Sequence, residues 1–397
     1  MLIRRAVLLA VLCLLVTGLP VTVVLMLSPP DVKAVTPMTK LTHGEGTNLD
    51  PNLSPDGRRI AFSSNRSGSF DIWLMDTYGR KLVRLTSMPG DEVGPRWSPD
   101  GKEIAFLSVE RQTGIWVMNL VSLRARQLIE ATEVQNDFEW SPNSLMLVYE
   151  SKTAGNWTIS TVDAFGHRTQ LTAPDCSSKY PSWSPDGRQI VFSSNRLSRN
   201  YEIWILNTDG NGLKQLTSAS GFSIKPRINP LDGRVLFLSN RSNYWDLWVM
   251  NADGTNQSQV LTPYGEETMG WRPAVGMDSD LGWSPDGLRM IFSSTRADRS
   301  AANLFMVQPP GYEVVTGARE YPSIVAVEDQ TFGVTVEYAG APVTRLSTPM
   351  SPETKSFMDD FNPCWSRDGK RIVFQSGHDG NFDIWLISFE RSVTSYR

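Results

Sequence analysis

The chain has 397 residues, of which 40% are hydrophobic and 20% are charged, with 38 Lys and Arg against 42 Asp and Glu. A net charge of −4 and a pI near 5.6 argue against the basic surface by which proteins bind nucleic acid. The charges are mixed along the chain without a long run of one sign, as on an ordinary soluble surface.

An apolar segment opens the chain. Arg4 and Arg5 precede residues 6–27, which contain no charged side chain. As a helix this segment spans about 33 Å, enough for a bilayer core of about 30 Å, whereas a cleavable signal peptide has an apolar region of only about 7–15 residues. We therefore predict a membrane anchor at residues 1–28 and a linker at 29–38. The two arginines would stay in the cytoplasm and place the rest of the chain outside it. Cleavage before Val35, giving a secreted or periplasmic protein, is the alternative.

Seven copies of one pattern fill residues 39–397. Each copy has a Ser-Pro-Asp-Gly turn after an aromatic strand end, followed by Ile-x-Phe-Ser, Ile-Trp and Leu-Thr. The residues that open the turns are Ser54, Ser98, Ser141, Ser184, Asn229, Ser284 and Ser366, and the first five are 43 to 45 residues apart. A period of about 40–45 residues with several short strands is typical of a β-propeller blade.

The first copy predicts four strands. Gly57 accepts the positive φ of the turn, and the alternation of Ile60 and Phe62 indicates a strand with one buried face. A third strand surrounds Trp73, and the fourth ends at Thr86. Eleven of the 13 tryptophans occupy equivalent positions in strands one and three, so we expect them to fill the wedges between blades rather than form a binding surface.

The Leu-Thr ends predict how the ring closes. They begin at Leu41, Leu85, Leu128, Leu171, Leu216, Leu261 and Leu346, so one precedes the first copy and none follows the last. Residues 39–42 should therefore be the outer strand of the final blade, which protects the edges of the ring. The expected fold is all-β: a seven-bladed β-propeller of four-stranded blades closed by an N-terminal strand and preceded by a transmembrane helix. Because Ser366 follows Ser284 by nearly two periods, eight blades with one degenerate blade are the alternative.

These residues resemble the WD40-like repeat of TolB-type β-propellers, which also occurs beside peptidase domains in tricorn and prolyl-oligopeptidase-like proteins. The resemblance lies in Trp183-Ser184-Pro185-Asp186-Gly187, Ile190 to Arg196 and Phe382-Asp383-Ile384-Trp385, and it covers about residues 39–390. It implies the propeller fold. TolB itself has an α/β domain before a six-bladed propeller, and this sequence has only about ten residues between the apolar segment and the first strand, so the likeness is to the propeller alone.

The repeat is interrupted by insertions near 268–279, 308–341 and 348–360. Within the largest, residues 312–315 and 334–338 predict a β-hairpin on one face of the ring. The other two insertions are neighbouring connectors on the opposite face. We hypothesise that they form a partner-binding surface, because Trp271 is a tryptophan outside the repeat. The surface would contain Tyr264, Glu267, Trp271, Arg272, Phe357, Asp359 and Asp360. Alternatively, Trp271 packs beneath its own loop.

The sequence contains few groups suited to catalysis. The three histidines, His43, His167 and His378, form no His-x-x-His pair, and there is no Cys-x-x-Cys, so we predict no metal or cofactor. No Gly-x-Ser-x-Gly elbow is present. Cys13 lies in the apolar segment, and Cys176 and Cys364 belong to distant copies, so no disulfide is expected.

Four arginines recur after the second strand. Arg66, Arg196, Arg241 and Arg296 could form a cationic rim for an anion, but we expect structural pairing with acids such as Asp50, Glu92 and Asp137.

The sequence thus predicts a non-catalytic, membrane-anchored, extracytoplasmic and monomeric propeller that binds another protein. The alternative is a carbohydrate or small-molecule binding propeller, or a propeller hydrolase, that uses carboxylates at the axial channel.

Overall fold

The computed structural model describes residues 38–389, apart from 45, 111–112, 131–133, 243–244, 261–280, 295–302, 308–334, 339–340, 346–358 and 379–380. Residues 1–33 and 34–397 form separate units, and all described residues belong to the second. Regular structure in these ranges consists of β-strands. The anchor predicted at 1–28 falls outside them, and within the described part of the chain no helix has the length and apolarity needed to cross a membrane.

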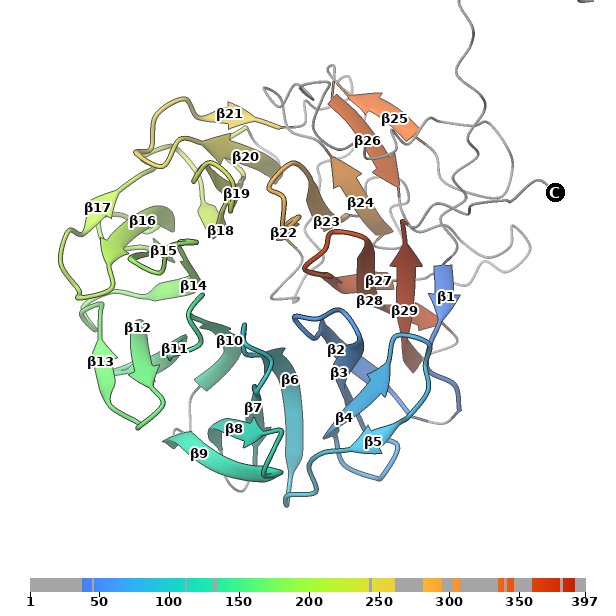
Figure 1. Cartoon of the computed structure of the whole chain (residues 1–397). Helices are drawn as coiled ribbons and strands as arrows, with labels where there is room; N and C mark the ends of the chain where they lie inside the picture. Colours follow the sequence, from blue (N-terminus) through green and yellow to red (C-terminus); the bar gives the residue numbers. More distant parts are fainter. Residues whose placement is uncertain are drawn as a thin grey trace, which may run out of the picture. The chain divides into compact units, whose positions relative to one another are not determined.

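The strands form antiparallel sheets that surround a common axis (Figure 1). Five consecutive four-stranded sheets begin the ring. The first contains β2 (Asn48–Leu53), β3 (Arg59–Ser64), β4 (Asp71–Asp76) and β5 (Val83–Arg84). The second contains β6 (Asp91–Trp97), β7 (Glu103–Val109), β8 (Gly114–Asn119) and β9 (Arg124–Glu130). The third contains β10 (Val134–Trp140), β11 (Met146–Thr153), β12 (Asn156–Asp163) and β13 (Arg168–Gln170). The fourth contains β14 (Ser178–Trp183), β15 (Gln189–Ser194), β16 (Glu202–Asn207) and β17 (Lys214–Gln215). The fifth contains β18 (Ser223–Ile228), β19 (Val235–Ser239), β20 (Asp246–Met250) and β21 (Ser258–Gln259).

The sixth sheet departs from the predicted four strands. Its strands are β22 (Leu281–Trp283), β23 (Met290–Ser294) and β24 (Asn303–Val307), followed outward by β26 (Ala341–Arg345) and then β25 (Thr335–Tyr338). The insertion after β24 thus supplies both the usual fourth strand, β26, and a fifth, β25, which pairs with it. Residues 334–338 were expected to form a hairpin with 312–315, which lie outside the described residues. Within the described residues, 335–338 pair with β26, to which a short connection joins them. Since β25 and β26 extend the sixth sheet, the described residues contain no separate eighth sheet.

The chain ends join in the last sheet, as the Leu-Thr count predicted. β27 (Asp359–Trp365), β28 (Arg371–His378) and β29 (Asn381–Ser388) are completed by β1 (Met38–Lys40). Met38 pairs with Ile387 and Lys40 with Trp385. In total the described strands form six four-stranded sheets and one five-stranded sheet. Pairing β1 with β29 covers an edge that would otherwise expose unpaired backbone groups.

The hydrophobic core lies between neighbouring sheets rather than inside any one of them. One cluster joins Ala61 and Leu74 of the first sheet to Trp97 and Ile104 of the second. The tryptophan positions in strand one also lock the sheets together through hydrogen bonds: the indole N–H of Trp97 donates to the carbonyl of Asn52, 3.1 Å away, in the preceding sheet. The expectation that the recurrent tryptophans build the scaffold is therefore confirmed.

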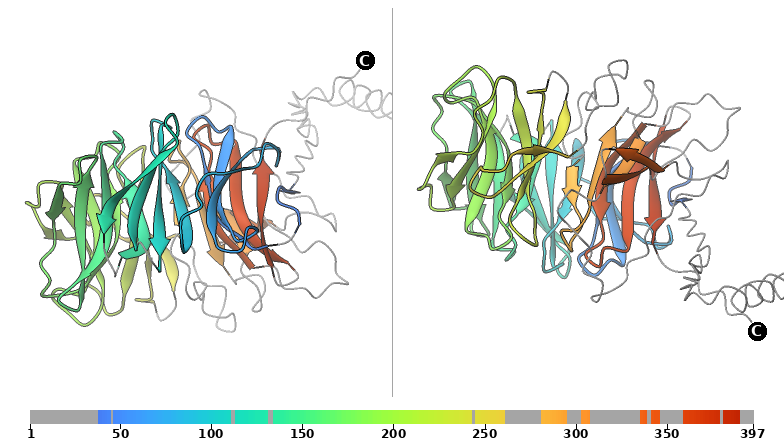
Figure 2. Two further views of the ribbon diagram at one scale, coloured as in Figure 1. Left: turned by 90° about the horizontal axis from the view of Figure 1, so that it is seen from below. Right: turned by 90° about the horizontal axis from the view of Figure 1, so that it is seen from above.

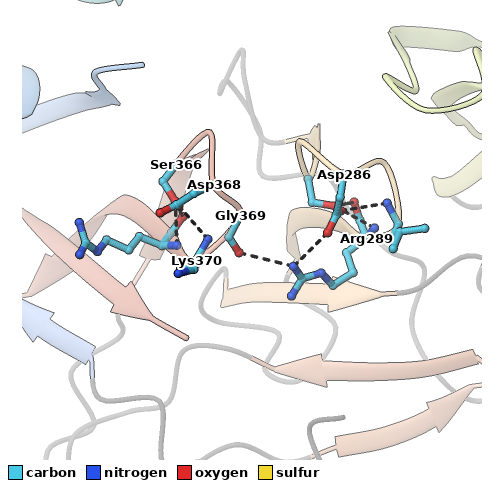
Figure 3. Close-up of polar contacts among 9 residues, drawn as sticks. Asp286, Arg289, Ser366, Asp368, Gly369 and Lys370 are labelled. Carbon is cyan, nitrogen blue, oxygen red and sulfur yellow. Dashed lines mark hydrogen bonds and ion pairs between the residues drawn. The ribbon is translucent and has the colours of Figure 1, made fainter. Parts of the chain in front are cut away.

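The Ser-Pro-Asp-Gly motif is a hydrogen-bonded turn. In the last copy, the Oδ1 atom of Asp368 accepts a hydrogen bond from the hydroxyl of Ser366 at 2.6 Å and from the backbone N–H of Lys370 at 3.1 Å. Neighbouring turns also contact each other: Arg289 donates to the carbonyl of Gly369 at 3.4 Å (Figure 3). The motif thus closes each first hairpin and connects it to the next sheet.

Strand direction gives the ring two different faces, seen edge-on in Figure 2. We call "turn face" the one that carries the first-to-second and third-to-fourth strand turns of each sheet, such as residues 54–58 and 77–82. The "connector face" carries the second-to-third strand turns and the links between sheets, such as residues 65–70 and 86–90. Because β1 takes the place of a fourth strand, its first residue, Met38, lies on the turn face beside Ile387.

Candidate functional site

The predicted partner-binding surface is described only in part. Five of its residues, Tyr264, Glu267, Trp271, Arg272 and Phe357, lie outside the described residues. The other two, Asp359 and Asp360, were expected on a connector. They form the first two residues of β27, opposite Gly377 and Ser376. The first strand of each sheet is the innermost one and begins on the connector face. The two aspartates therefore lie at the connector-face end of β27.

The innermost strands carry a recurring position directly before the strand-one tryptophan, or before Leu53 and Ile228, which replace it in the first and fifth sheets. We call these residues the axial ring: Asn52, Arg96, Glu139, Ser182, Arg227, Gly282 and Cys364. The innermost strands β2, β6, β10, β14, β18, β22 and β27 surround the axis in Figure 1. Indole N–H groups hold four ring residues by the backbone carbonyl, namely those of Asn52, Arg96, Glu139 and Arg227, at 3.0 to 3.2 Å. The tryptophans that build the scaffold therefore also position the axial ring.

Charges interact across the axial ring. Burial raises the pKa of Glu139, and the positive charge of Arg227, two sheets further along, opposes this change. Burial likewise raises the pKa of the Cys364 thiol, and Arg96 opposes that change. Asn52 donates to the Cys364 sulfur at 3.5 Å and accepts from the backbone N–H of Trp97 at 2.9 Å. The axial ring thus combines two guanidinium groups, Arg96 and Arg227, with one carboxyl, Glu139.

A second layer lies two residues before the axial ring on the same strands, at a bulge. Asp50, Tyr180, Lys225 and Asn362 have φ between 52° and 58°, a conformation that costs energy in residues with a side chain. The backbone N–H of Asp50 donates to Gln375 at 2.8 Å, and that of Lys225 donates to Ser193 at 3.2 Å. These bonds to the preceding sheet hold the bulge in place.

The bulge layer differs around the axis. On one side Asn362 donates to Asp50 at 3.0 Å. On the other, the ammonium of Lys225 lies 5.6 Å from the ring centroid of Tyr180. The layer therefore offers an amide-carboxylate pair on one side and a cation with an aromatic ring on the other. In the described part of the chain, no group of three His, Cys, Asp or Glu side chains is placed to hold a metal ion.

Buried acids recur at the start of strand three and explain the Leu-Thr motif. Thr42 donates to the carboxylate of Asp383 at 2.7 Å and accepts from the N–H of Ile384 at 2.9 Å. Thr217 makes the same bond to Glu202. Each such threonine thereby joins strand four to strand three and satisfies a buried carboxylate.

Glu92 is a buried acid that the repeat does not explain. It lies on β6, fully inaccessible, where the first sheet has Asn48 and the fifth has Ser223. Burial, and secondarily the charge of Asp71, raise the pKa of Glu92 to about 7. At neutral pH this carboxyl is therefore close to half protonated.

The described recurrent arginines have structural partners. Two of them, Arg66 and Arg241, donate hydrogen bonds to neutral side chains rather than to the acids predicted. Arg66 donates to the side-chain oxygen of Asn48 at 2.7 Å, and Arg241 to the hydroxyl of Ser223 at 3.0 Å. The Arg66 guanidinium also lies 5.1 Å from the ring centroid of Trp73. Neutral side chains suit this place because each arginine already interacts with the buried acid of the preceding sheet, Asp383 for Arg66 and Glu202 for Arg241. Arg196 pairs with Asp175, 3.7 Å away, and Arg296 falls outside the described residues.

The two described cysteines, Cys176 and Cys364, are free thiols.

Comparison with known proteins agrees with this geometry. The family model for the TolB beta propeller domain matches residues 32–184. The Tol-Pal system protein TolB of Francisella tularensis subsp. tularensis (strain WY96-3418) is 30% identical over 194 residues, which make up 47% of this chain and 44% of that protein. This chain therefore spans less than half the length of that relative.

Two solved structures have a similar fold. An oligogalacturonate lyase in complex with manganese matches with a TM-score of 0.61 and 15% identity, covering 90% of this chain and 94% of its own. TolB from Acinetobacter baumannii matches with a TM-score of 0.51 and 15% identity, covering 79% and 67%. At these identities the structural likeness establishes the fold alone. The family match and the Tol-Pal relative show that this chain contains repeats similar to those of the TolB beta propeller domain, over residues 32–184.

Proposed function

We propose that this protein is a non-catalytic, membrane-anchored propeller outside the cytoplasm that binds another protein, with its sheets acting as a single rigid scaffold. The observation that carries the proposal is the engagement of the axial ring in bonds between sheets. Three of its residues illustrate this: Asn52 bridges Cys364 and Trp97, and the carbonyl of Glu139 accepts the indole N–H of Trp183. Polar groups held in this way make the ring of sheets rigid, as a scaffold that presents a binding surface requires. The relative named as a Tol-Pal system protein supports the same class of function.

The proposed partner surface is the pair of connectors around Trp271 and Phe357, next to the start of β27. A photo-crosslinking amino acid at position 271 should capture a protein in intact cells. The same amino acid at Leu197, an exposed residue on the connector face of the fourth sheet, serves as the matched control. Trp271→Ala should then weaken capture without lowering the melting temperature. A loss of stability with unchanged capture would show instead that Trp271 packs beneath its own loop.

The proposed anchor is tested separately by fractionation. The chain should stay in membranes after carbonate extraction, and its N-terminus should be intact. Mature protein that begins near Val35 and washes off membranes would replace the anchor by a cleaved signal and leave the partner surface untested by that result alone.

A second function, carbohydrate binding or cleavage at the axis, is favoured by one observation. Glu139 has a raised pKa and faces the field of Arg227, so it could act as an acid beside a cation that binds a carboxylated sugar. One structure that shares the fold is an oligogalacturonate lyase. Incubating the chain with oligogalacturonate and following unsaturated products separates the two proposals. Turnover that disappears in Glu139→Gln would establish the second function; its absence is the result expected here.

A further inference from the structure

Exposed apolar side chains gather on the turn face. The described residues contain ten large hydrophobic side chains that are exposed, and nine of them lie in or directly beside the first-to-second or third-to-fourth strand turns: Tyr78, Leu82, Val83, Val121, Leu123, Leu145, Phe165, Leu213 and Leu231. Among the described residues, Leu197 is the one large exposed hydrophobic side chain on the connector face, where several loops lie outside the described ranges. The turn-face residues are therefore considered by their own pattern rather than by comparison of the two faces.

The most exposed of these residues occupy one equivalent position, the tip of the third-to-fourth strand turn. Tyr78, Val121 and Phe165 hold this position in the first three sheets and are 73%, 86% and 87% exposed. In the fourth and fifth sheets the same position is Asp209 and Asp253. The apolar tips therefore follow one another along one arc of the ring, and the arc ends where aspartate returns.

The turns themselves do not require apolar tips. The backbone N–H of Tyr78 donates to Asp76 at 3.0 Å, and that of Phe165 donates to Asp163 at 2.8 Å. Asn119 accepts from the N–H of Val121 at 3.1 Å. In every case the turn is closed by the residue two positions earlier, so the turn itself does not require an apolar side chain at its tip.

Positive charges accompany the apolar tips. Arg80 and Lys81 follow Tyr78, and both are exposed. Arg124 and Arg168 are the exposed bases of the second and third turns. The acids of the first and third turns, Asp76 and Asp163, accept hydrogen bonds from backbone N–H groups, and Asp163 also lies 2.8 Å from the imidazole of His167. Large apolar tips interleaved with bases are the pattern by which proteins lie on anionic bilayers, because the apolar groups enter the headgroup boundary while the bases attract acidic lipids.

The path of the chain leads to the same face. Met38 begins β1 on the turn face, beside Ile387. The first described residue of the chain therefore lies on the turn face.

We propose that the third-to-fourth strand turns of the first three sheets dock the propeller onto an anionic phospholipid surface. Tyr78, Val121 and Phe165 enter the interface, while Arg80, Lys81, Arg124 and Arg168 bind lipid phosphates. This rests on the proposed anchorage only for bringing the face near the bilayer. It leaves the connector face, with the proposed partner surface, turned away from the membrane.

The test places an environment-sensitive fluorophore on the tip. The full chain, with its three cysteines replaced by serine, receives Val121→Cys or the matched control Leu197→Cys and is reconstituted into vesicles of phosphatidylcholine with or without phosphatidylglycerol. We expect blue-shifted emission at position 121 in vesicles containing phosphatidylglycerol, less shift in phosphatidylcholine alone, and water-like emission at 197. Adding Tyr78→Asp and Phe165→Asp should lower the fraction of the fluorophore at position 121 that has blue-shifted emission about tenfold. Because aspartate already occupies this position in two sheets, these changes should leave the fold and melting temperature intact.

Three results would overturn the proposal. In the first, the emission at position 121 stays water-like in anionic vesicles. In the second, the emission at position 197 shifts as much as that at 121. In the third, the emission at 121 shifts only after envelope proteins are added, which would make the turn face a protein interface. Carbonate extraction of the same vesicles separates this outcome from failure of the anchor: a chain that is released has no anchor, whereas a retained chain with water-like emission at 121 is anchored but not docked.

Discussion

Replacing Glu92 by Gln is expected to stabilise the ring at alkaline pH and to change its stability little at acidic pH. Glu92 is inaccessible on β6, and its pKa is raised from 4.5 to about 7 by burial and, secondarily, by Asp71. The folded chain therefore binds the proton more tightly than the unfolded chain. The stabilisation linked to that proton is complete below about pH 4.5 and is lost as the pH rises through about 7.

The size of the effect follows from the two pKa values. At 1.36 kcal/mol per pH unit, ionising this carboxyl in the folded state costs about 3 kcal/mol at about pH 8. Gln carries no charge to ionise and has the size of Glu. Asn48 and Ser223 show that a neutral polar side chain fits the same place in two other sheets. Glu92→Gln should recover most of the cost.

Urea unfolding, followed by tryptophan fluorescence at about pH 5 and about pH 8, measures the difference. We expect Glu92→Gln to exceed the native chain by about 3 kcal/mol at the higher pH and to match it within about 1 kcal/mol at the lower pH. Glu130→Gln, at the exposed end of β9, is the control and should show no pH-dependent difference. The reasoning is refuted if Glu92→Gln is destabilised equally at both pH values, because Glu92 would then be a stabilising, ionised group.

Other perturbations test the scaffold. Trp97→Phe removes an indole N–H bond of 3.1 Å to the preceding sheet and should lower the free energy of unfolding by about 1–2 kcal/mol, measured by urea unfolding. Gly114→Ala should cost at least about 2 kcal/mol and lower the melting temperature, because φ is 146° and a Cβ would lie 1.9 Å from the carbonyl oxygen of Ile129. Deleting residues 1–42 should cause aggregation, seen by light scattering, that deleting 1–33 does not cause, since only the longer deletion removes β1 and exposes β29. Equal behaviour of the two deletions would contradict the closure argument.

Much of the scaffold could be predicted because it repeats. A turn that needs positive φ at Gly57, a buried Phe62 and a tryptophan at the strand end recur in copy after copy, so each copy supports the others. The closing strand could be predicted by counting the Leu-Thr ends. The first of the seven precedes the first copy of the repeat, and none follows the last copy. Local periodicity determines these features, and local periodicity is visible in a sequence.

The sixth sheet and the arginine partners were not predictable in the same way. Which strand pairs with β26 depends on distance in space, and the sequence pattern did not indicate that residues 335–338 would be its outer neighbour. Arg66 was expected near an acid, yet it donates to Asn48, because the fold brings the buried carboxylate of the preceding sheet into its field instead. Contacts between residues distant in sequence are decided by packing.

The sequence by itself determined that this chain is a ring of short-stranded sheets, closed by its N-terminal strand and built around recurrent tryptophans, because a repeated pattern can bury its apolar residues only by stacking copies. Only the tertiary structure decided which side chains meet. It united Arg96, Glu139 and Arg227 in the axial ring, buried Glu92 beside Asp71, and gathered Tyr78, Val121 and Phe165 on the face where β1 begins. The reason is that strand direction assigns every turn to a face, and ring closure brings sheets far apart in sequence into one electrostatic field.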